Sequence, residues 1–183
     1  MPFSELAFMV QRIASASLLP LTVDIEAGYS KDADIIVDHI QQLAELGVVG
    51  INIEDSRVDG ERALIARDEF TRLLSHICLQ LKARQIAIFI NVRCDVFLLG
   101  SENAVEESIK RADAYQVAGA DGLFFPCITQ IDDIKAVVAA TSLPVNVMSM
   151  PELPNFAHET MYLGLGRQLR EIKQQGSCAP LFN

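Results

Sequence analysis

The feature that most constrains the fold is an alternation of strand-length apolar segments with longer amphipathic segments. Each strand-like segment is followed by a segment that carries apolar residues at helical spacing. Strands that alternate with helices along a chain favour a parallel sheet covered by helices, so the fold class is α/β. The pattern predicts five strands, over residues 21–26, 48–55, 86–96, 122–126 and 143–148. It also predicts helices over residues 3–16, 30–47, 65–83 and 102–118, and another that begins near residue 129.

Two architectures fit this alternation. The five predicted strands would form either an open, flavodoxin-like sheet or an incomplete parallel (β/α) barrel of the TIM type, which has eight strands when complete. In both, ligands bind at the carboxyl ends of the strands. We expect a single, partial barrel domain over residues 1–183, in which residues 156–183 form a divergent tail with a helix-like piece at 163–175. Strand order separates the alternatives, because an open doubly wound sheet does not keep its strands in chain order.

Acidic residues gather at the ends of the first two predicted strands. In the segment LTVDIEAGYS, Asp24 and Glu26 lie two residues apart, so on a strand both side chains point to one face, about 7 Å apart. Glu54 lies near the end of the next strand and shares a face with Asn52. Carboxylates this close are favourable when a cation lies beside them or when one of them keeps its proton.

The third predicted strand brings a cation to the same edge. Asn91, Arg93 and Asp95 share one face of that strand, again near its carboxyl end. Carboxylates and an arginine together suit a hard cation such as Mg²⁺ and an anionic substrate held by the guanidinium group. The alternative is a buried salt-bridge network in which Arg93 neutralises the acids without any ligand. Such networks are costly to desolvate, which favours the binding site.

Charge and cysteine pattern exclude several classes of protein. The formal net charge of −9 argues against a nucleic-acid surface, because phosphate binding draws on clustered Lys and Arg. The longest apolar runs are of strand length, so no membrane segment is expected. The four cysteines form no CxxC pair, which favours reduced thiols in a cytoplasmic protein. The glycines form no phosphate-binding motif.

Five blocks of this sequence, in order, resemble the isocitrate lyase and phosphoenolpyruvate mutase superfamily, with the chain most similar to its mutase-like members. The blocks are DIEAGYS at Asp24, GINIEDS at Gly50, INVRCD at Ile90, GADGLFFP at Gly119 and LPVNVM at Leu143. The resemblance implies a Mg²⁺-dependent barrel enzyme, a lyase or phosphonomutase. Its substrate would be a small 2-oxo or 2-hydroxy carboxylic acid, which would react through an enolpyruvate-like intermediate.

The resemblance also implies roles for individual residues. Asp24 would reach the metal, directly or through water, and Glu26 and Glu54 would complete the metal's shell. Arg93 would contact the carboxylate or phosphoryl group of the substrate, and Arg93 and Glu54 are the candidate catalytic residues. Asn91 and Asn146, which lie in the matching blocks, are candidates for substrate binding.

Three departures from the family pattern support a second hypothesis. The loop SRVDGER lacks the Cys, Lys and His residues found there in the lyase branch, leaving Arg57, Asp59 or Arg62 as substitutes for the missing acid. Strands that open the family's barrel have no counterpart, and the tail matches only loosely, so the chain resembles a member truncated at both ends. The alternative function is therefore an inactive remnant that at most associates with a full-length relative. The exposed edges of an open barrel also predict a homo-oligomer.

Overall fold

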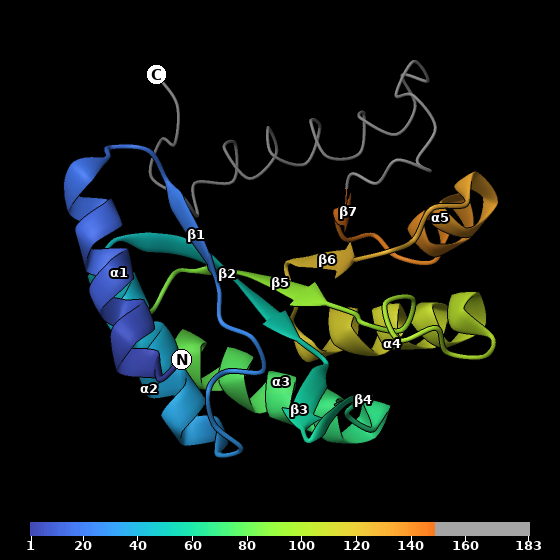
Figure 1. Ribbon diagram of the computed structural model, residues 1–183, viewed down its shortest axis with the longest axis horizontal. Helices are drawn as coiled ribbons and strands as arrows, with labels where there is room; N and C mark the ends of the chain where they lie inside the picture. The colour runs from blue at the N-terminus through green and yellow to red at the C-terminus, as the bar shows by residue number, and fades with distance from the viewer. Residues whose placement is uncertain (149–183) are drawn as a thin grey trace.

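A five-stranded parallel sheet forms the centre of the fold (Figure 1). The computed structural model describes residues 1–148, and every structural statement below refers to that part of the chain. The strands are β1 (Leu21–Asp24), β2 (Val48–Glu54), β5 (Phe89–Arg93), β6 (Gly122–Phe125) and β7 (Val145–Val147). They lie in the order β1-β2-β5-β6-β7, and each pairs in parallel with the next.

The strand order decides between the two predicted architectures. The five parallel strands follow one another in chain order, as in a barrel, so the flavodoxin-like alternative is wrong. The described residues form an incomplete (β/α) barrel, which confirms the predicted fold class. The strands are mostly shorter than predicted: the first ends at Asp24 rather than Glu26, and the third covers Phe89–Arg93 only.

Five helices lie along the outside of the sheet (Figure 1). Each helix contacts the next one in the chain, so the helical layer follows the order of the strands. A membrane-spanning helix is not found among residues 1–148, because every helix there is too short or too polar. The helices are α1 (Phe3–Ala16), α2 (Ala33–Glu45), α3 (Arg67–Ala83), α4 (Ala104–Ala118) and α5 (Ile131–Ala139).

Apolar side chains from both layers form one core. Ile51 and Val92 from the sheet are almost fully buried, as are Ile40 and Leu74 from the helices. Burying each such side chain contributes about 1.5–3 kcal/mol to stability. This core fixes the positions at which the strands end, and therefore the positions of the polar residues that follow.

A β-hairpin replaces the loop that was predicted after the second strand. Strands β3 (Ser56–Asp59) and β4 (Glu61–Leu64) pair in antiparallel fashion, with Asp59 opposite Glu61. Gly60 makes the turn with a φ of 84°, in the left-handed region that glycine adopts without strain. The predicted tail, residues 156–183, lies outside the described residues, and the homo-oligomer stays a prediction.

Candidate functional site

The segment between β1 and α2 forms a tight turn that is bonded to β2. Glu26 adopts a left-handed φ of 50°, and its backbone N–H donates a hydrogen bond of 2.8 Å to Asp24 Oδ1. Glu54 N–H donates a hydrogen bond of 2.9 Å to the carbonyl oxygen of Glu26. The prediction that Glu26 extends the strand is therefore wrong, because β1 ends at Asp24. The turn nevertheless brings the backbone of Glu26 next to Glu54.

Gly28 allows this turn to approach α2 closely. Its φ is 93°, and a Cβ atom at this position would lie 2.8 Å from the side chain of Ile36. Tyr29 follows, and its hydroxyl donates a long hydrogen bond of 3.5 Å to Glu26 Oε1. Burial and the negative charges of Glu26 and Asp24 raise the pKa of Tyr29, which keeps its hydroxyl protonated.

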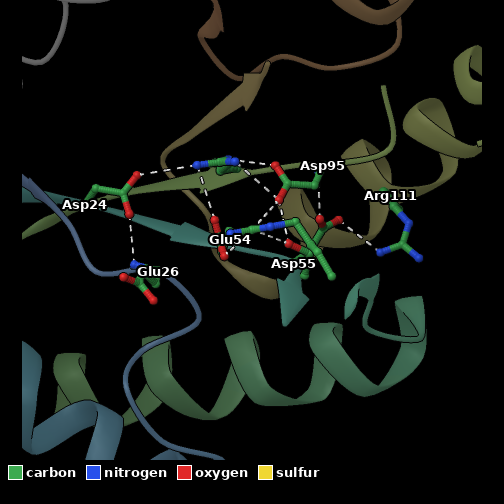
Figure 2. Close-up of polar contacts among 9 residues, drawn as sticks. Asp24, Glu26, Glu54, Asp55, Asp95 and Arg111 are labelled. Carbon is green, nitrogen blue, oxygen red and sulfur yellow. Dashed lines mark hydrogen bonds and ion pairs between the residues drawn. The ribbon is translucent and has the colours of Figure 1, made fainter. Parts of the chain in front are cut away.

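Two arginines hold the central carboxylate of the site. Arg93, the last residue of β5, places Nη1 3.2 Å from Glu54 Oε2 and 3.9 Å from Asp24 Oδ2. Arg62, on β4, donates a hydrogen bond of 2.6 Å from Nη1 to Glu54 Oε1. Both arginines also contact Asp95, through Arg93 Nε at 2.6 Å and Arg62 Nη1 at 3.1 Å. Figure 2 shows Asp24, Glu54 and Asp95 joined through these contacts.

The buried position of Glu54 between two arginines changes the pKa of its carboxyl group. Its side chain is only 4% exposed, and burial raises the pKa of its carboxyl above the ordinary value. Arg62 and Arg93 act in the opposite direction and limit the rise. A carboxyl with a raised pKa suits proton transfer better than an exposed one. Cys94, on the opposite face, is fully buried, and burial raises the pKa of its thiol, which argues against a nucleophile.

Three asparagines form a chain of hydrogen bonds across the sheet. Asn91 Nδ2 donates to Asn52 Oδ1 at 2.9 Å, and Asn146 Nδ2 donates to Asn91 Oδ1 at 3.1 Å. The second bond passes over Gly122 on the intervening strand, where a Cβ atom would lie 2.8 Å from Asn91 Oδ1. The two asparagines predicted to bind substrate thus lie side by side.

A cavity of about 330 Å³ opens beside Glu54, between the β1–α2 turn and the hairpin. Glu26 and Tyr29 line one wall, and Arg57 lines the other. Lys31 Nζ and Asp59 Oδ2 form an exposed ion pair of 3.2 Å that joins the turn to the hairpin. This volume suits a small molecule such as a short carboxylic acid.

Proteins commonly bind Mg²⁺ through one or two carboxylates together with waters and substrate oxygens. Asp24 and Glu26 are exposed and meet this requirement. Glu54 has both oxygens engaged by guanidinium groups. Within residues 1–148, no three His, Cys, Asp or Glu side chains are grouped so that they could hold a metal ion. The exposed carboxylates of Asp24 and Glu26 match the donor chemistry that Mg²⁺ needs, whereas both oxygens of Glu54 are engaged by its arginines.

Asp55 anchors the end of β2 to the helical layer. Its Oδ2 accepts hydrogen bonds from Arg111 Nη1 at 2.9 Å and from the Tyr115 hydroxyl at 2.8 Å, and both partners lie on α4. Its Oδ1 accepts a hydrogen bond of 2.8 Å from the backbone N–H of Asp95. Burial raises the pKa of the Asp55 carboxyl, and Arg111 opposes that rise. This network holds Asp55 in place. It therefore also positions Glu54, the preceding residue in the chain, and Asp95, whose backbone N–H binds Asp55.

Sequence reasoning named Arg62 only as one of three substitutes for a missing acid. The structure places it at the centre of the site through the hairpin that was predicted as a loop. The dipeptide Asp59-Gly60 is a known hairpin signal, but its flanking segments alternate only weakly between apolar and polar residues. Arg57 and Asp59 lie elsewhere on the hairpin, paired with Glu69 and Lys31.

Comparison with known proteins gives consistent matches. The profile of the family described as phosphoenolpyruvate phosphomutase matches residues 1–167. An oxaloacetate decarboxylase of Rhodopseudomonas palustris (strain TIE-1) is 32% identical over 165 residues, which are 85% of this chain and 54% of the relative. The chain spans about half the length of the curated relatives that it matches.

Solved structures agree with the sequence matches. A candidate phosphonomutase from Burkholderia cenocepacia J2315 is 32% identical, with a TM-score of 0.77 over 96% of this chain and 79% of that one. A phosphonopyruvate hydrolase, solved in complex with oxalate and Mg²⁺, has a TM-score of 0.69 over 96% of this chain and 68% of that one. At 21% identity, the hydrolase supports the fold alone.

Proposed function

Since this chain belongs to the phosphoenolpyruvate phosphomutase family, we propose that it is a Mg²⁺-dependent enzyme with lyase or phosphonomutase-like activity. Its substrate is a small 2-oxo or 2-hydroxy carboxylic acid that reacts through an enolpyruvate-like intermediate. The observation that carries this proposal is the meeting of Asp24, Glu54 and Arg93 from the ends of three strands. Of these three residues, Glu54 also lines the cavity of about 330 Å³.

The residues of the site have distinct roles in this proposal. Asp24 and Glu26 would hold Mg²⁺, with Glu54 in its outer shell, and the ion would polarise a carbonyl group and offset the charge of an enolate. Arg93 binds the carboxylate of the substrate, since a guanidinium group recognises carboxylates in a bidentate way. Glu54, whose pKa is raised by burial, transfers a proton. Asn91 and Asn146 orient the substrate from the face that they share.

Calorimetric titration with oxalate, a mimic of an enolate, tests this proposal. We expect wild-type protein to bind oxalate only when Mg²⁺ is present, and Asp24→Ala and Arg93→Ala to lose that binding. Glu61→Gln, which removes an exposed carboxylate on the hairpin, is the matched control and should bind as wild type does. Equal binding by wild type and Asp24→Ala would rule out the assignment of the metal site.

The inactive-remnant hypothesis makes the opposite prediction for turnover. The match to the family profile does not favour an inactive remnant over an active enzyme. Purified protein should be assayed against a panel of 2-oxo acids, phosphonates and isocitrate-like substrates. Turnover that disappears in Arg93→Ala rejects the remnant, whereas an inactive protein that binds neither Mg²⁺ nor oxalate supports it.

A further inference from the structure

The β1–α2 turn contains two residues in a backbone conformation that residues with a Cβ atom rarely adopt. Glu26 has a φ of 50° and Tyr29 a φ of 60°, and Gly28 lies between them with a φ of 93°. The left-handed conformation costs free energy for Glu26 and Tyr29, so it persists only where neighbouring contacts hold it. Glu26 is held by hydrogen bonds between its own backbone and Asp24 and Glu54. Tyr29 needs a support of its own.

His39, on α2, binds the peptide group that precedes Tyr29. Its Nδ1 lies 3.0 Å from the carbonyl oxygen of Gly28, and because a carbonyl only accepts hydrogen bonds, Nδ1 carries the proton. Gly28 is buried, and within residues 1–148 His39 is the donor that its carbonyl has, so losing this bond would be costly. Rotation of the planar Gly28–Tyr29 peptide would bring the φ of Tyr29 to the negative values that L residues prefer. The same rotation would carry the Gly28 oxygen away from Nδ1, so His39 opposes the relaxation of Tyr29.

Phe3, the first residue of α1, holds the imidazole ring of His39 in place. The two rings are stacked, with centroids 3.7 Å apart and planes inclined by 17°. The Phe3 ring also contacts the ring of Tyr29, at a centroid distance of 5.8 Å. All three side chains are half-buried, so the rings form a packed cluster rather than a set of free surface groups.

Tyr29 connects this cluster to the candidate site. Its side chain lines the cavity together with Glu26, and its hydroxyl lies 3.5 Å from Glu26 Oε1. The φ of a residue sets where its Cβ atom points relative to the preceding peptide, so a relaxed Tyr29 would no longer direct its ring at this wall. The hydrogen bond from His39 thus decides whether Tyr29 faces the cavity.

We propose that His39 is a positioning residue, which holds the Gly28–Tyr29 peptide and so keeps the Tyr29 hydroxyl on the cavity wall, where it donates a hydrogen bond to the bound acid. The inference rests on the proposed function, because it takes a small carboxylic acid as the occupant of the cavity. His39 itself touches neither metal nor substrate and acts through Tyr29.

Fluorine NMR of protein labelled with fluorotyrosine tests whether His39 positions Tyr29. The chain has three tyrosines, and Tyr29→Phe identifies the signal of Tyr29. His39→Phe keeps a ring for Phe3 to stack on but removes the donor, whereas His39→Asn keeps an N–H donor close to the place of Nδ1. We expect the Tyr29 signal to move toward its unfolded position in His39→Phe and to stay near the wild-type position in His39→Asn. The Tyr115 signal, from the buried network on α4, reports that each variant is folded. An unchanged Tyr29 signal in folded His39→Phe overturns the inference.

The wild-type protein provides a test that needs no variant to fold. In ¹⁵N-histidine-labelled protein at pH 8, the nitrogen shifts show which ring nitrogen of each histidine carries the proton. We expect His39 to carry it on Nδ1, and His76, whose Nε2 lies 2.7 Å from Asp34 Oδ1, to carry it on Nε2. A spectrum in which no histidine is protonated on Nδ1 overturns the inference.

Calorimetric titration with oxalate in the presence of Mg²⁺ tests the consequence for binding. We expect His39→Phe to bind at least about fivefold more weakly than wild type, at the lower end of typical coupling between two sites. His39→Asn should restore most of the affinity, and His76→Phe, which changes an exposed histidine on α3, should bind as wild type does. Equal affinity of His39→Phe and wild type overturns the inference. Wild-type protein that binds no oxalate contradicts the proposed function instead, and the Tyr29 signal then decides on His39 alone.

Discussion

Glu54 and Asp55 are adjacent in the chain, yet their carboxylates bind groups in different layers of the fold. Glu54 is held by Arg62 and Arg93 beside the cavity, whereas Asp55 accepts hydrogen bonds from Arg111 and Tyr115 on α4. Figure 2 shows Asp55 joined to Arg111. One dipeptide therefore serves both the candidate site and the packing of a helix on the sheet. The two carboxylates should respond differently to substitution.

Asp55→Asn should destabilise the protein strongly. It removes the fully buried partner of Arg111, whose side chain is only 5% exposed, and leaves that guanidinium with Glu107, 2.8 Å from Nε, as its remaining carboxylate. Breaking a buried pair costs about 3–5 kcal/mol, and the contact with Glu107 places the expected loss at the lower end of that range. Urea unfolding followed by circular dichroism measures the loss. Glu106→Gln, which breaks the exposed pair with Lys110 on the same helix, is the control and should leave the midpoint unchanged. Equal midpoints for both variants would contradict the role assigned to Asp55.

Gly28→Ala should be more harmful than Gly47→Ala, although the two glycines have nearly the same φ, 93° and 91°. An alanine Cβ at position 28 would lie 2.8 Å from Ile36, whereas a Cβ at position 47 meets nothing within 4 Å. The overpacking should add about 1–3 kcal/mol to the loss at position 28. Urea unfolding of both variants provides the comparison, and a larger loss at position 47 would contradict it.

Asn91→Ala should cost more stability than Asn52→Ala. Asn91 takes part in two bonds of the asparagine chain, and Asn52 in one. Replacing Asn91 removes the donor to Asn52 Oδ1 and leaves Asn146 Nδ2 with only its long hydrogen bond of 3.4 Å to the carbonyl oxygen of Leu123. A buried polar group left without a partner costs about 1–3 kcal/mol. If Asn91 also orients the substrate, its variant should raise KM in any assay that shows turnover. Equal unfolding midpoints for the two variants would show that the asparagine chain is not stabilising.

Cys78 should be almost inert towards alkylation at pH 8. Burial, together with the negative charge of Asp121, raises the pKa of its thiol to about 12. The thiolate is the reactive form, so at pH 8 roughly one molecule in ten thousand is reactive in the folded state. The labelling rate should rise about tenfold per pH unit between pH 8 and pH 10, since each unit raises the thiolate fraction tenfold. Mass spectrometry after iodoacetamide treatment measures it, and labelling at pH 8 as fast as in urea would contradict the prediction.

The fold class and the positions of the main strands follow from local sequence patterns. The segment Val48–Asp55 predicted β2 to within one residue, because a nearly continuous apolar run ends sharply in acid. Strand order could not be predicted with the same certainty, since the chain order of a barrel and the rearranged order of an open, flavodoxin-like sheet would bury the same apolar faces. The prediction that Glu26 continues the first strand was wrong for a local reason. The alternation of side chains stops at Ile25, and the backbone of the next residue, Glu26, adopts a left-handed conformation.

The details of the site depend on contacts that no local pattern encodes. Asn91 and Asn146 are 55 residues apart, and their bond requires that Gly122, on a strand between them, carries no side chain. Arg62 reaches Glu54 only because the hairpin folds back toward the sheet. Asp24, Glu54 and Arg93 were predictable because each is the last residue of a parallel strand and these ends meet at one edge of the sheet, whereas the arginine from the hairpin was not.

The order of the strands has a consequence for how the chain assembles. Among the described residues, each of the four strands that follow β1 in the parallel sheet pairs with the sheet strand before it in the chain, and none must be inserted between two strands made earlier. Contacts between neighbours in sequence carry a low entropic cost of loop closure, so they form early. During synthesis, β1, α2 and β2 can dock before β6 has left the ribosome. The fold can thus grow from its N-terminal end in the direction of translation.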